Sequence, residues 1–178
     1  MQLKNKAKEI SAQLSREYKL PLFAMPKISK INVSVGIGKE RGDEGKIKLI
    51  ENELAKITGQ HPKYDIAKKS IAGFKLREGQ KIGFSVTLRD KNMWGFFAKV
   101  VGVVLPRMRD FKGIDPKSFD KSNNLTIGIK EQIVFPEIRS DEVKEIWGMS
   151  ITVNIKCASN RELTQKYLSL LGLIFKKE

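Results

Sequence analysis

The chain contains few side chains that could act as a nucleophile or bind a metal ion. It has one histidine, His61, and one cysteine, Cys157, and neither lies near a cluster of partner residues that catalysis or metal binding needs. We therefore predict that the protein is not an enzyme and uses no metal or other cofactor. His61 is expected in a surface loop. Cys157 continues the apolar side of an alternating segment, which predicts a small buried side chain.

A glycine-rich segment at residues 36–45 superficially resembles a phosphate-binding loop. A P-loop requires a Gly-Lys-Ser/Thr triplet, but Gly38 and Lys39 are followed by Glu40. The dinucleotide-binding fingerprint also fails, because Arg41 stands where its third glycine belongs. We interpret this segment as an exposed loop and predict no nucleotide site.

Four segments alternate between apolar and polar residues with the period of two that is typical of β-strands. Their polar positions are Lys30, Asn32, Ser34, Gly83, Ser85, Thr87, Arg89, Thr126, Gly128, Lys130, Ser150, Thr152, Asn154 and Lys156. None of these is an acid, whereas solvated sheet faces usually mix acids with lysines. This pattern favours a face that binds a phosphate-bearing ligand, and the alternative is an ordinary solvated sheet face.

The net charge supports a polyanionic partner. The 178 residues include 34 lysines and arginines against 20 acids, which gives a formal charge of +14. Nucleic acid and anionic membranes are the usual partners of such a surface. The longest apolar runs flank Lys99 and are too short to cross a bilayer, so we expect nucleic acid and no membrane. The charged N-terminal segment does not resemble a signal peptide, which predicts a cytoplasmic protein.

Apolar residues at helical spacing predict four helices, at about residues 2–18, 47–57, 90–104 and 159–171. Asp90 and Ser159 are candidate N-caps, while Gly59 and Pro106 are candidate helix ends. Residues 64–81 show a weak pattern and are predicted to be a long basic loop. We predict an α+β fold: one domain over residues 1–178, a two-layer sandwich whose antiparallel-rich sheet packs helices on one face and leaves an open polar RNA-binding face.

Several strings resemble, in order, the bacterial-type family of large-subunit ribosomal protein five, which binds 5S rRNA. They are KINVSVGIG at 30–38, TGQHP at 58–62, AKKSIAGFKLREG at 67–79, VTLR at 86–89, PRMRDFKG at 106–113 and GIKEQIVFPEI at 128–138. The resemblance implies a structural constituent of the large ribosomal subunit in the central protuberance. Its implied partners are 5S rRNA, 23S rRNA, peptidyl-site tRNA, neighbouring ribosomal proteins and a small-subunit head protein.

The resemblance and the charge pattern together assign three sets of residues. The candidate rRNA-binding residues are Lys30, Asn32, Ser34, Gln60, Lys68, Lys69, Ser70, Thr87, Arg89, Arg107 and Arg109. The candidate tRNA-binding residues are Gly73, Phe74, Lys75, Arg77, Gly79 and Lys81. A local acidic patch of Glu137, Asp141, Glu142 and Glu145 is the candidate bridge to the small subunit, or else a cluster that opens a helix.

None of the polar sheet positions is aromatic. We therefore predict that the sheet recognises RNA through hydrogen bonds to sugars, phosphates and base edges, with stacking as a minor contribution. A free-standing RNA chaperone or regulatory RNA-binding module has the same charge and sheet pattern and is the main alternative. An RNA-modifying enzyme and a membrane-surface protein are further alternatives.

Overall fold

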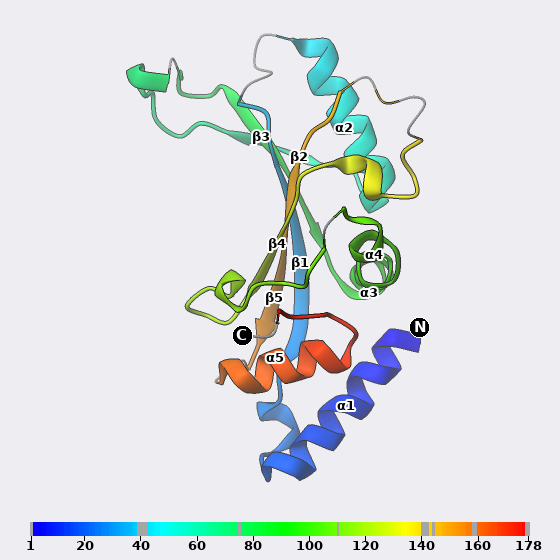
Figure 1. The fold of residues 1–178 in the computed structure, drawn as a ribbon. Helices are drawn as coiled ribbons and strands as arrows, with labels where there is room; N and C mark the ends of the chain where they lie inside the picture. Colours follow the sequence, from blue (N-terminus) through cyan, green and yellow to red (C-terminus); the bar gives the residue numbers. More distant parts are fainter. Residues whose placement is uncertain are drawn as a thin grey trace. The chain divides into compact units, whose positions relative to one another are not determined.

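The computed structural model describes residues 2–38, 43–74, 76–109, 111–139, 143, 145–157 and 160–176, which confirm an α+β fold with an antiparallel sheet (Figure 1). The strands are β1 (Lys27–Gly36), β2 (Lys63–Ile66), β3 (Lys81–Leu88), β4 (Leu125–Ile129) and β5 (Met149–Lys156). Their order in the sheet is β2-β3-β1-β5-β4. The helices are α1 (Gln2–Tyr18), α2 (Glu44–Thr58), α3 (Asp90–Lys99), α4 (Leu105–Arg107) and α5 (Arg161–Leu170).

The chain divides into two compact units. The first, which we call the helical unit, comprises Met1–Ile31, Leu88–Ile127 and Ile151–Glu178. The second, which we call the hairpin unit, comprises Asn32–Thr87 and Gly128–Ser150. The single domain over residues 1–178 stays a prediction.

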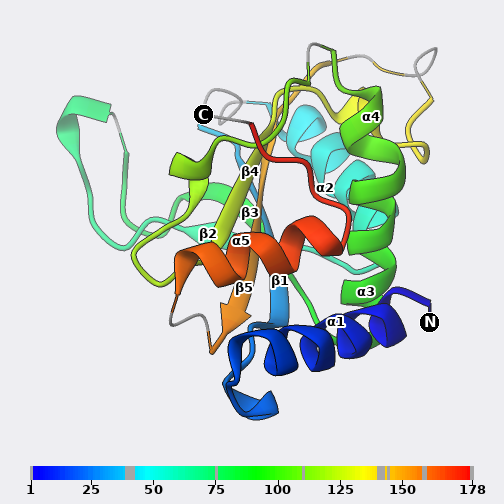
Figure 2. The same cartoon turned by 60° about the horizontal axis from the view of Figure 1, so that its bottom comes forward.

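The core of the helical unit lies where α1 packs against α3 and α5, and Figure 2 shows α1 and α5 side by side. Leu14 of α1, Phe97 of α3 and Tyr167 of α5 are each at most 1% exposed. Burial raises the pKa of Tyr167 to about 12, because the phenolate is poorly solvated there. The helical periodicity of the sequence therefore correctly predicted this core.

The third predicted helix differs from the structure at both ends. Arg89, not Asp90, is the N-cap residue, and no side-chain hydrogen bond caps this end. The helix also continues beyond the predicted stop: a π-helical turn over Val100–Val104 leads into α4, which includes Pro106. Proline has no N–H group to donate within a helix. In the wider π-helical turn, the N–H of Leu105, the residue before Pro106, bonds to the carbonyl of Val100 five residues earlier.

In the hairpin unit, α2 follows its predicted pattern. The carboxylate of Asp43 accepts a hydrogen bond from the N–H of Lys46, and Gly59 ends the helix with a φ of 67°. The buried side of α2 consists of Ile47, Ile50, Leu54, Ile57 and Thr58. Residues 39–42, on which the rejection of a P-loop depended, lie outside the described residues.

Strand β2 corrects the prediction of a continuous loop over residues 64–81. It pairs antiparallel with β3, so that Tyr64 lies opposite Phe84, and their ring centroids are 4.8 Å apart. The strand is only 4 residues long, and Ile66 at its end is 57% exposed. Such a short segment shows little periodicity by itself, and the pairing with β3 stabilises it.

The turn between β5 and α5 contains two further corrections. Cys157 is exposed, not buried, because it lies beyond the last residue of β5 with a φ of 58°. Asn160 is the N-cap of α5, and its side-chain oxygen accepts a hydrogen bond from the N–H of Glu162. Ser159, the predicted cap, lies outside the described residues.

Candidate nucleic-acid interface

The polar side of the hairpin unit carries an ordered pair of side chains. The hydroxyl of Thr87 on β3 donates a hydrogen bond of 3.1 Å to Oδ1 of Asn32 on β1. Both residues are half-buried, so each keeps some access to solvent. Because Oδ1 of Asn32 is engaged with Thr87, the amide presents its N–H2 group as a donor to a ligand.

A carboxylate also lies on this polar side, which overturns the expectation of a face without acids. Asp65 lies opposite Gly83 in the β2–β3 pairing, and its Oδ1 accepts a 2.9 Å hydrogen bond from the hydroxyl of Ser85. From the sequence, Asp65 was not assigned to the polar side, because β2 was not predicted as a strand. The polar side therefore combines amide donors with carboxylate and hydroxyl acceptors, and it is not a purely cationic surface.

Gly83 is the one predicted outward position that the structure buries. A Cβ atom placed on it would lie 2.7 Å from the carbonyl oxygen of Val35 on β1. The glycine is therefore required for the close approach of two strands and is not available to a ligand.

The helical unit has polar strand residues of its own. The hydroxyls of Thr126 and Thr152 are 3.1 Å apart and hydrogen-bonded. Oδ1 of Asn154 is buried, and among the described residues no donor reaches it. Lys30 is half-buried, while Arg89 is exposed.

Three predicted rRNA-binding residues lie in or beside turns. Gln60 is exposed in the turn that follows α2, where its backbone carbonyl accepts a hydrogen bond from the hydroxyl of Thr58. Arg107 ends α4, and Arg109 is exposed just beyond it. The structure thus places the predicted rRNA-binding residues at helix ends and turns as well as on the sheet.

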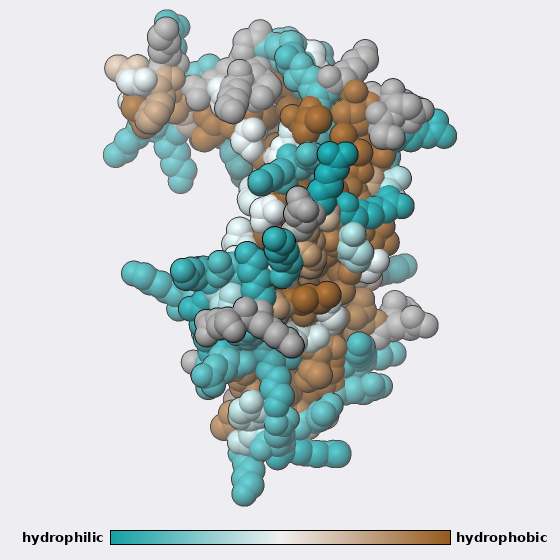
Figure 3. Space-filling model, viewed as in Figure 1, coloured by the Kyte–Doolittle hydropathy of each residue, from teal (hydrophilic) through white to brown (hydrophobic). Residues whose placement is uncertain are grey.

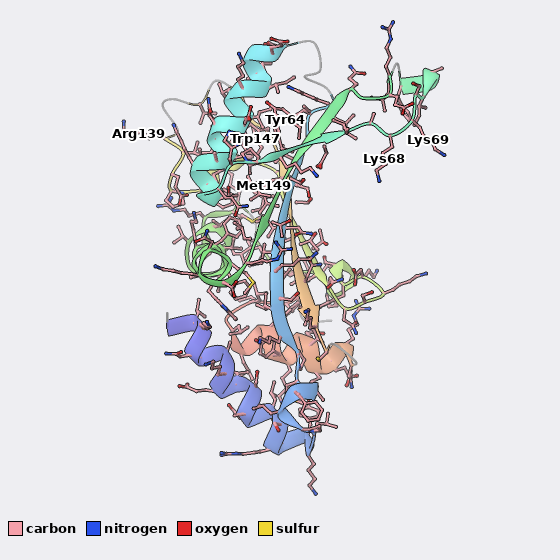
Figure 4. All side chains as sticks on the ribbon, turned by 180° about the vertical axis from the view of Figure 1, so that it is seen from behind. Tyr64, Lys68, Lys69, Arg139, Trp147 and Met149 are labelled. Carbon is pink, nitrogen blue, oxygen red and sulfur yellow. The ribbon has the colours of Figure 1, made fainter. Side chains whose placement is uncertain are left out.

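The β2–β3 hairpin, residues 63–88, carries the predicted basic segment. Lys68 and Lys69 are exposed and project outward from it (Figure 4). Ser70 is held in place because its hydroxyl accepts a 2.9 Å hydrogen bond from the N–H of Glu78. Ile71 and Leu76 exchange two backbone hydrogen bonds, so the described part of the hairpin end is an ordered turn.

The end of the hairpin is both apolar and basic. Phe74 is 71% exposed in the short helical turn Ala72–Phe74, and Ile71 is 46% exposed. Figure 3 shows hydrophobic residues at this end next to hydrophilic ones. Arg77 is exposed, Gly79 adopts a φ of 81°, and Lys75 lies outside the described residues. An exposed ring beside a cation can stack on a base and pair with a phosphate.

Lys81, also predicted to bind tRNA, is instead the first residue of β3 and lies in the paired part of the hairpin, opposite Ile66 of β2. Its Nζ atom is 3.9 Å from the centroid of the Tyr64 ring, which is a cation–π contact. The hydroxyl of Tyr64 donates to Glu51, and this hydrogen bond together with burial raises the pKa of Tyr64. These contacts give Lys81 a role in joining β2 to β3.

The predicted acidic patch is described only in part. Glu137 is exposed, and Glu145 forms an ion pair with Lys46 of α2. Asp141 and Glu142 lie outside the described residues. Glu145 is therefore already engaged within the hairpin unit.

A buried glutamine joins the segment after β4 to the segment before β5. Gln132 is fully buried: its Nε2 donates to the backbone carbonyl of Glu145, and its Oε1 accepts from the N–H of Trp147. The indole N–H of Trp147 donates to Glu53 of α2 over 2.7 Å. We call these contacts the Gln132 network; they attach the segment that contains Glu145 and Trp147 to α2.

We expect Gln132→Ala to lower the free energy of unfolding by about 1–3 kcal/mol, because the N–H of Trp147 and the carbonyl of Glu145 lose their partner in a buried site. Urea denaturation followed by tryptophan fluorescence measures this change. Gln13→Ala, at an exposed position of α1, is the matched control and should leave stability within about 0.5 kcal/mol. Equal stabilities of the two variants would show that the network is dispensable.

Two other classes of site have no counterpart in the part of the chain that the structure describes. Within the described ranges, no three His, Cys, Asp or Glu side chains are grouped so that they could hold a metal ion. Among the helices described, none has both the length and the apolar character needed to cross a membrane.

Comparisons with known proteins give a consistent result. Residues 23–77 match the family model described as ribosomal protein L5, and residues 81–175 match the model for the C-terminus of the same ribosomal family. A protein of Prochlorococcus marinus (strain MIT 9215), named large ribosomal subunit protein uL5, is 44% identical over 179 residues, covering 99% of each chain. Proteins of the same name from Thermotoga maritima and Halothermothrix orenii are 43% and 46% identical, covering 96% and 86% of this chain and 92% and 86% of their own lengths.

Proposed function

This chain belongs to the ribosomal protein L5 family and is therefore a structural, non-enzymatic protein of the large ribosomal subunit in the cytoplasm, and we propose that it binds 5S rRNA there. Its partners are rRNA and ribosomal proteins. The observation that supports 5S rRNA as the specific ligand is the pair of Asn32 and Thr87, whose hydrogen bond orients an amide donor on an accessible polar surface.

The binding mode follows from the atoms that this surface offers. Thr87 and Ser85 both direct their hydroxyl protons to neighbouring side chains, so each presents oxygen lone pairs outward. Together with the carboxylate of Asp65, these oxygens can accept hydrogen bonds from 2′-hydroxyls and base amino groups. A phosphate has no such donor, so these contacts distinguish sugars and bases from the backbone phosphates. We propose that the sheet recognises unpaired nucleotides of an RNA loop, while exposed lysines and arginines outside it contact phosphates.

The β2–β3 hairpin is proposed to contact peptidyl-site tRNA. Its end combines the exposed Phe74 ring with Arg77 and with Lys68 and Lys69 nearby in the chain. This composition suits a folded RNA that exposes a base or base pair. The acidic patch of Glu137, Asp141, Glu142 and Glu145 is proposed to face a small-subunit protein, and Glu145 also forms an ion pair with Lys46 of α2.

Nuclease footprinting of 5S rRNA with and without the protein tests this proposal directly. We expect protection of one loop and its flanking nucleotides, with reduced protection in Asn32→Ala. Absence of a footprint at moderate salt, where the protein remains folded, would remove 5S rRNA as the ligand.

A free-standing RNA chaperone is the second candidate because it would present the same charge. It would bind many RNAs with similar affinity and leave the ribosome easily. Co-sedimentation with large subunits in moderate salt separates the two: stable association at one copy per subunit supports the proposal, while loss to the supernatant supports the chaperone.

Asp65 provides a test of how the surface discriminates between RNAs. Asp65→Asn removes one negative charge, so we expect stronger binding to a scrambled RNA and a lower ratio of specific to scrambled affinity. The measurement is competition binding with labelled 5S rRNA. Glu9→Gln, an equal charge change at an exposed position of α1, should raise both affinities alike. An unchanged ratio in Asp65→Asn would mean that Asp65 serves only the fold.

A further inference from the structure

The short turn between α1 and β1 exposes several large apolar side chains to solvent. Phe23 is 83% exposed and Leu22 is 58% exposed, both within the 3-10 turn Leu22–Ala24. Leu20 just before this turn is 40% exposed. Large apolar side chains that are grouped and solvent-exposed usually mark a contact with a partner.

Hydrogen bonds hold this turn in one conformation. Ser15 of α1 bonds to both backbone groups of Leu20, through its carbonyl and its hydroxyl. Within the turn, the N–H of Ala24 donates to Pro21 and that of Met25 donates to Leu22. Met25 is itself only 2% exposed and anchors the end of the turn. The Phe23 ring is thus presented by a rigid frame, which limits the entropy lost when a partner binds it.

The charges around the turn are mainly positive. Lys19 precedes it and Lys27 follows it, and Arg16 lies on the last turn of α1; all three are exposed. The nearest carboxylate along the chain, Glu17, forms an ion pair with Lys166 of α5. An anionic partner is therefore favoured over a neutral or basic one.

We propose that Phe23 stacks on an unpaired base of ribosomal RNA, with Leu22 packing beside it and Lys19 and Lys27 contacting the flanking phosphates. This inference rests on the proposed function, since it assumes that the protein is bound to rRNA. A planar ring framed by cations is the arrangement with which proteins bind single-stranded nucleotides. Stacking is thereby supplied by a turn of the helical unit, whereas the polar sheet positions contain no aromatic side chain.

A protein partner fits the turn less well. Stable protein–protein interfaces bury roughly 800 Å² on each side and centre on a cluster of apolar anchors. The apolar surface here is confined to a few side chains of one turn, and its surroundings are cationic. A single stacked nucleotide needs no larger surface.

Four variants test the proposal by binding to large-subunit particles stripped of this protein. Phe23→Ala should weaken binding roughly 10-fold with an unchanged salt dependence, because stacking releases no counterions. Phe23→Tyr should bind like the unmodified protein. Lys27→Ala should instead lower the slope of log affinity against log salt by about 0.7 to 0.9. Ile174→Ala, at an apolar position that is 64% exposed in the same unit, is the control and should have no effect.

Photocrosslinking identifies the occupant. A benzophenone side chain placed at position 23 in assembled subunits should form adducts with a small number of rRNA nucleotides. Adducts only with a ribosomal protein, or none, would overturn the inference, as would wild-type binding by Phe23→Ala. If the unmodified protein itself fails to bind the stripped particles and 5S rRNA, the proposed function fails. If the unmodified protein binds and Phe23→Ala binds equally well, this inference alone fails.

Discussion

Replacing Asn32 with alanine is expected to weaken 5S rRNA binding by about 1–3 kcal/mol, or roughly 5- to 150-fold in Kd. The side chain presents an amide donor whose oxygen is already bonded to Thr87, so its orientation is set before RNA arrives. Removing it deletes a directional contact and leaves an RNA acceptor without a partner in a desolvated interface. Filter binding or gel shift with labelled 5S rRNA measures the effect.

Two kinds of control make this result interpretable. Asn92→Ala removes the same side chain from an exposed position of α3 and should bind normally. Thr87→Val keeps the shape of the side chain but removes the hydroxyl that orients Asn32, so it should lose part of the affinity, and Thr87→Ser should restore it. Unchanged affinity in Asn32→Ala would exclude this surface from the interface.

Replacing Phe74 and Arg77 together with alanine is expected to impair the retention of peptidyl-site tRNA while sparing 5S rRNA binding. The exposed ring can contribute about 1–3 kcal/mol by stacking, and the guanidinium adds a phosphate contact. Binding of labelled tRNA to ribosomes reconstituted with the variant measures the loss. The effect is confined to tRNA because the hairpin end lies many residues from Thr87 along β3, and its turn is held by its own backbone bonds.

The controls for this double variant come from the same unit. Ile146→Ala removes an apolar side chain that is 63% exposed, and Lys48→Ala removes an exposed charge from α2. Neither should change tRNA retention. Collapse of 5S rRNA binding in a folded Phe74 and Arg77 variant would contradict the separation of roles between sheet and hairpin.

Lys81 is a poorer choice than Arg77 for removing charge from the hairpin. The resemblance placed it with the tRNA-binding residues, but its ammonium lies over the Tyr64 ring in the paired part of the hairpin. Lys81→Ala would therefore disturb the pairing of β2 with β3 as well as remove a charge. Arg77 is exposed and makes its described hydrogen bonds through backbone atoms, so its replacement removes the charge with less effect on the fold.

Local periodicity explains which elements were predicted well. The apolar spacing of α1 and α2 and the alternation of β1, β3, β4 and β5 are properties of short segments, and they appear in the structure close to the expected bounds. The features that were missed depend on residues distant in sequence or on a local rearrangement of hydrogen bonds. The strand β2 is stabilised by β3, and the continuation of α3 through Pro106 depends on a shifted hydrogen bond to Val100.

By itself the sequence determined that the protein is basic and α+β, that it has a single histidine and a single cysteine, and that it resembles the ribosomal family to which it belongs. These properties follow from composition, from local alternation and from strings that need no partner segment to be recognised. Only the tertiary structure decided that Asp65 lies beside Ser85, that Thr87 orients Asn32 and that the frame around Phe23 leaves its ring exposed. Each of those depends on strand register and on contacts between separate segments, which hydrophobic periodicity along one segment does not encode.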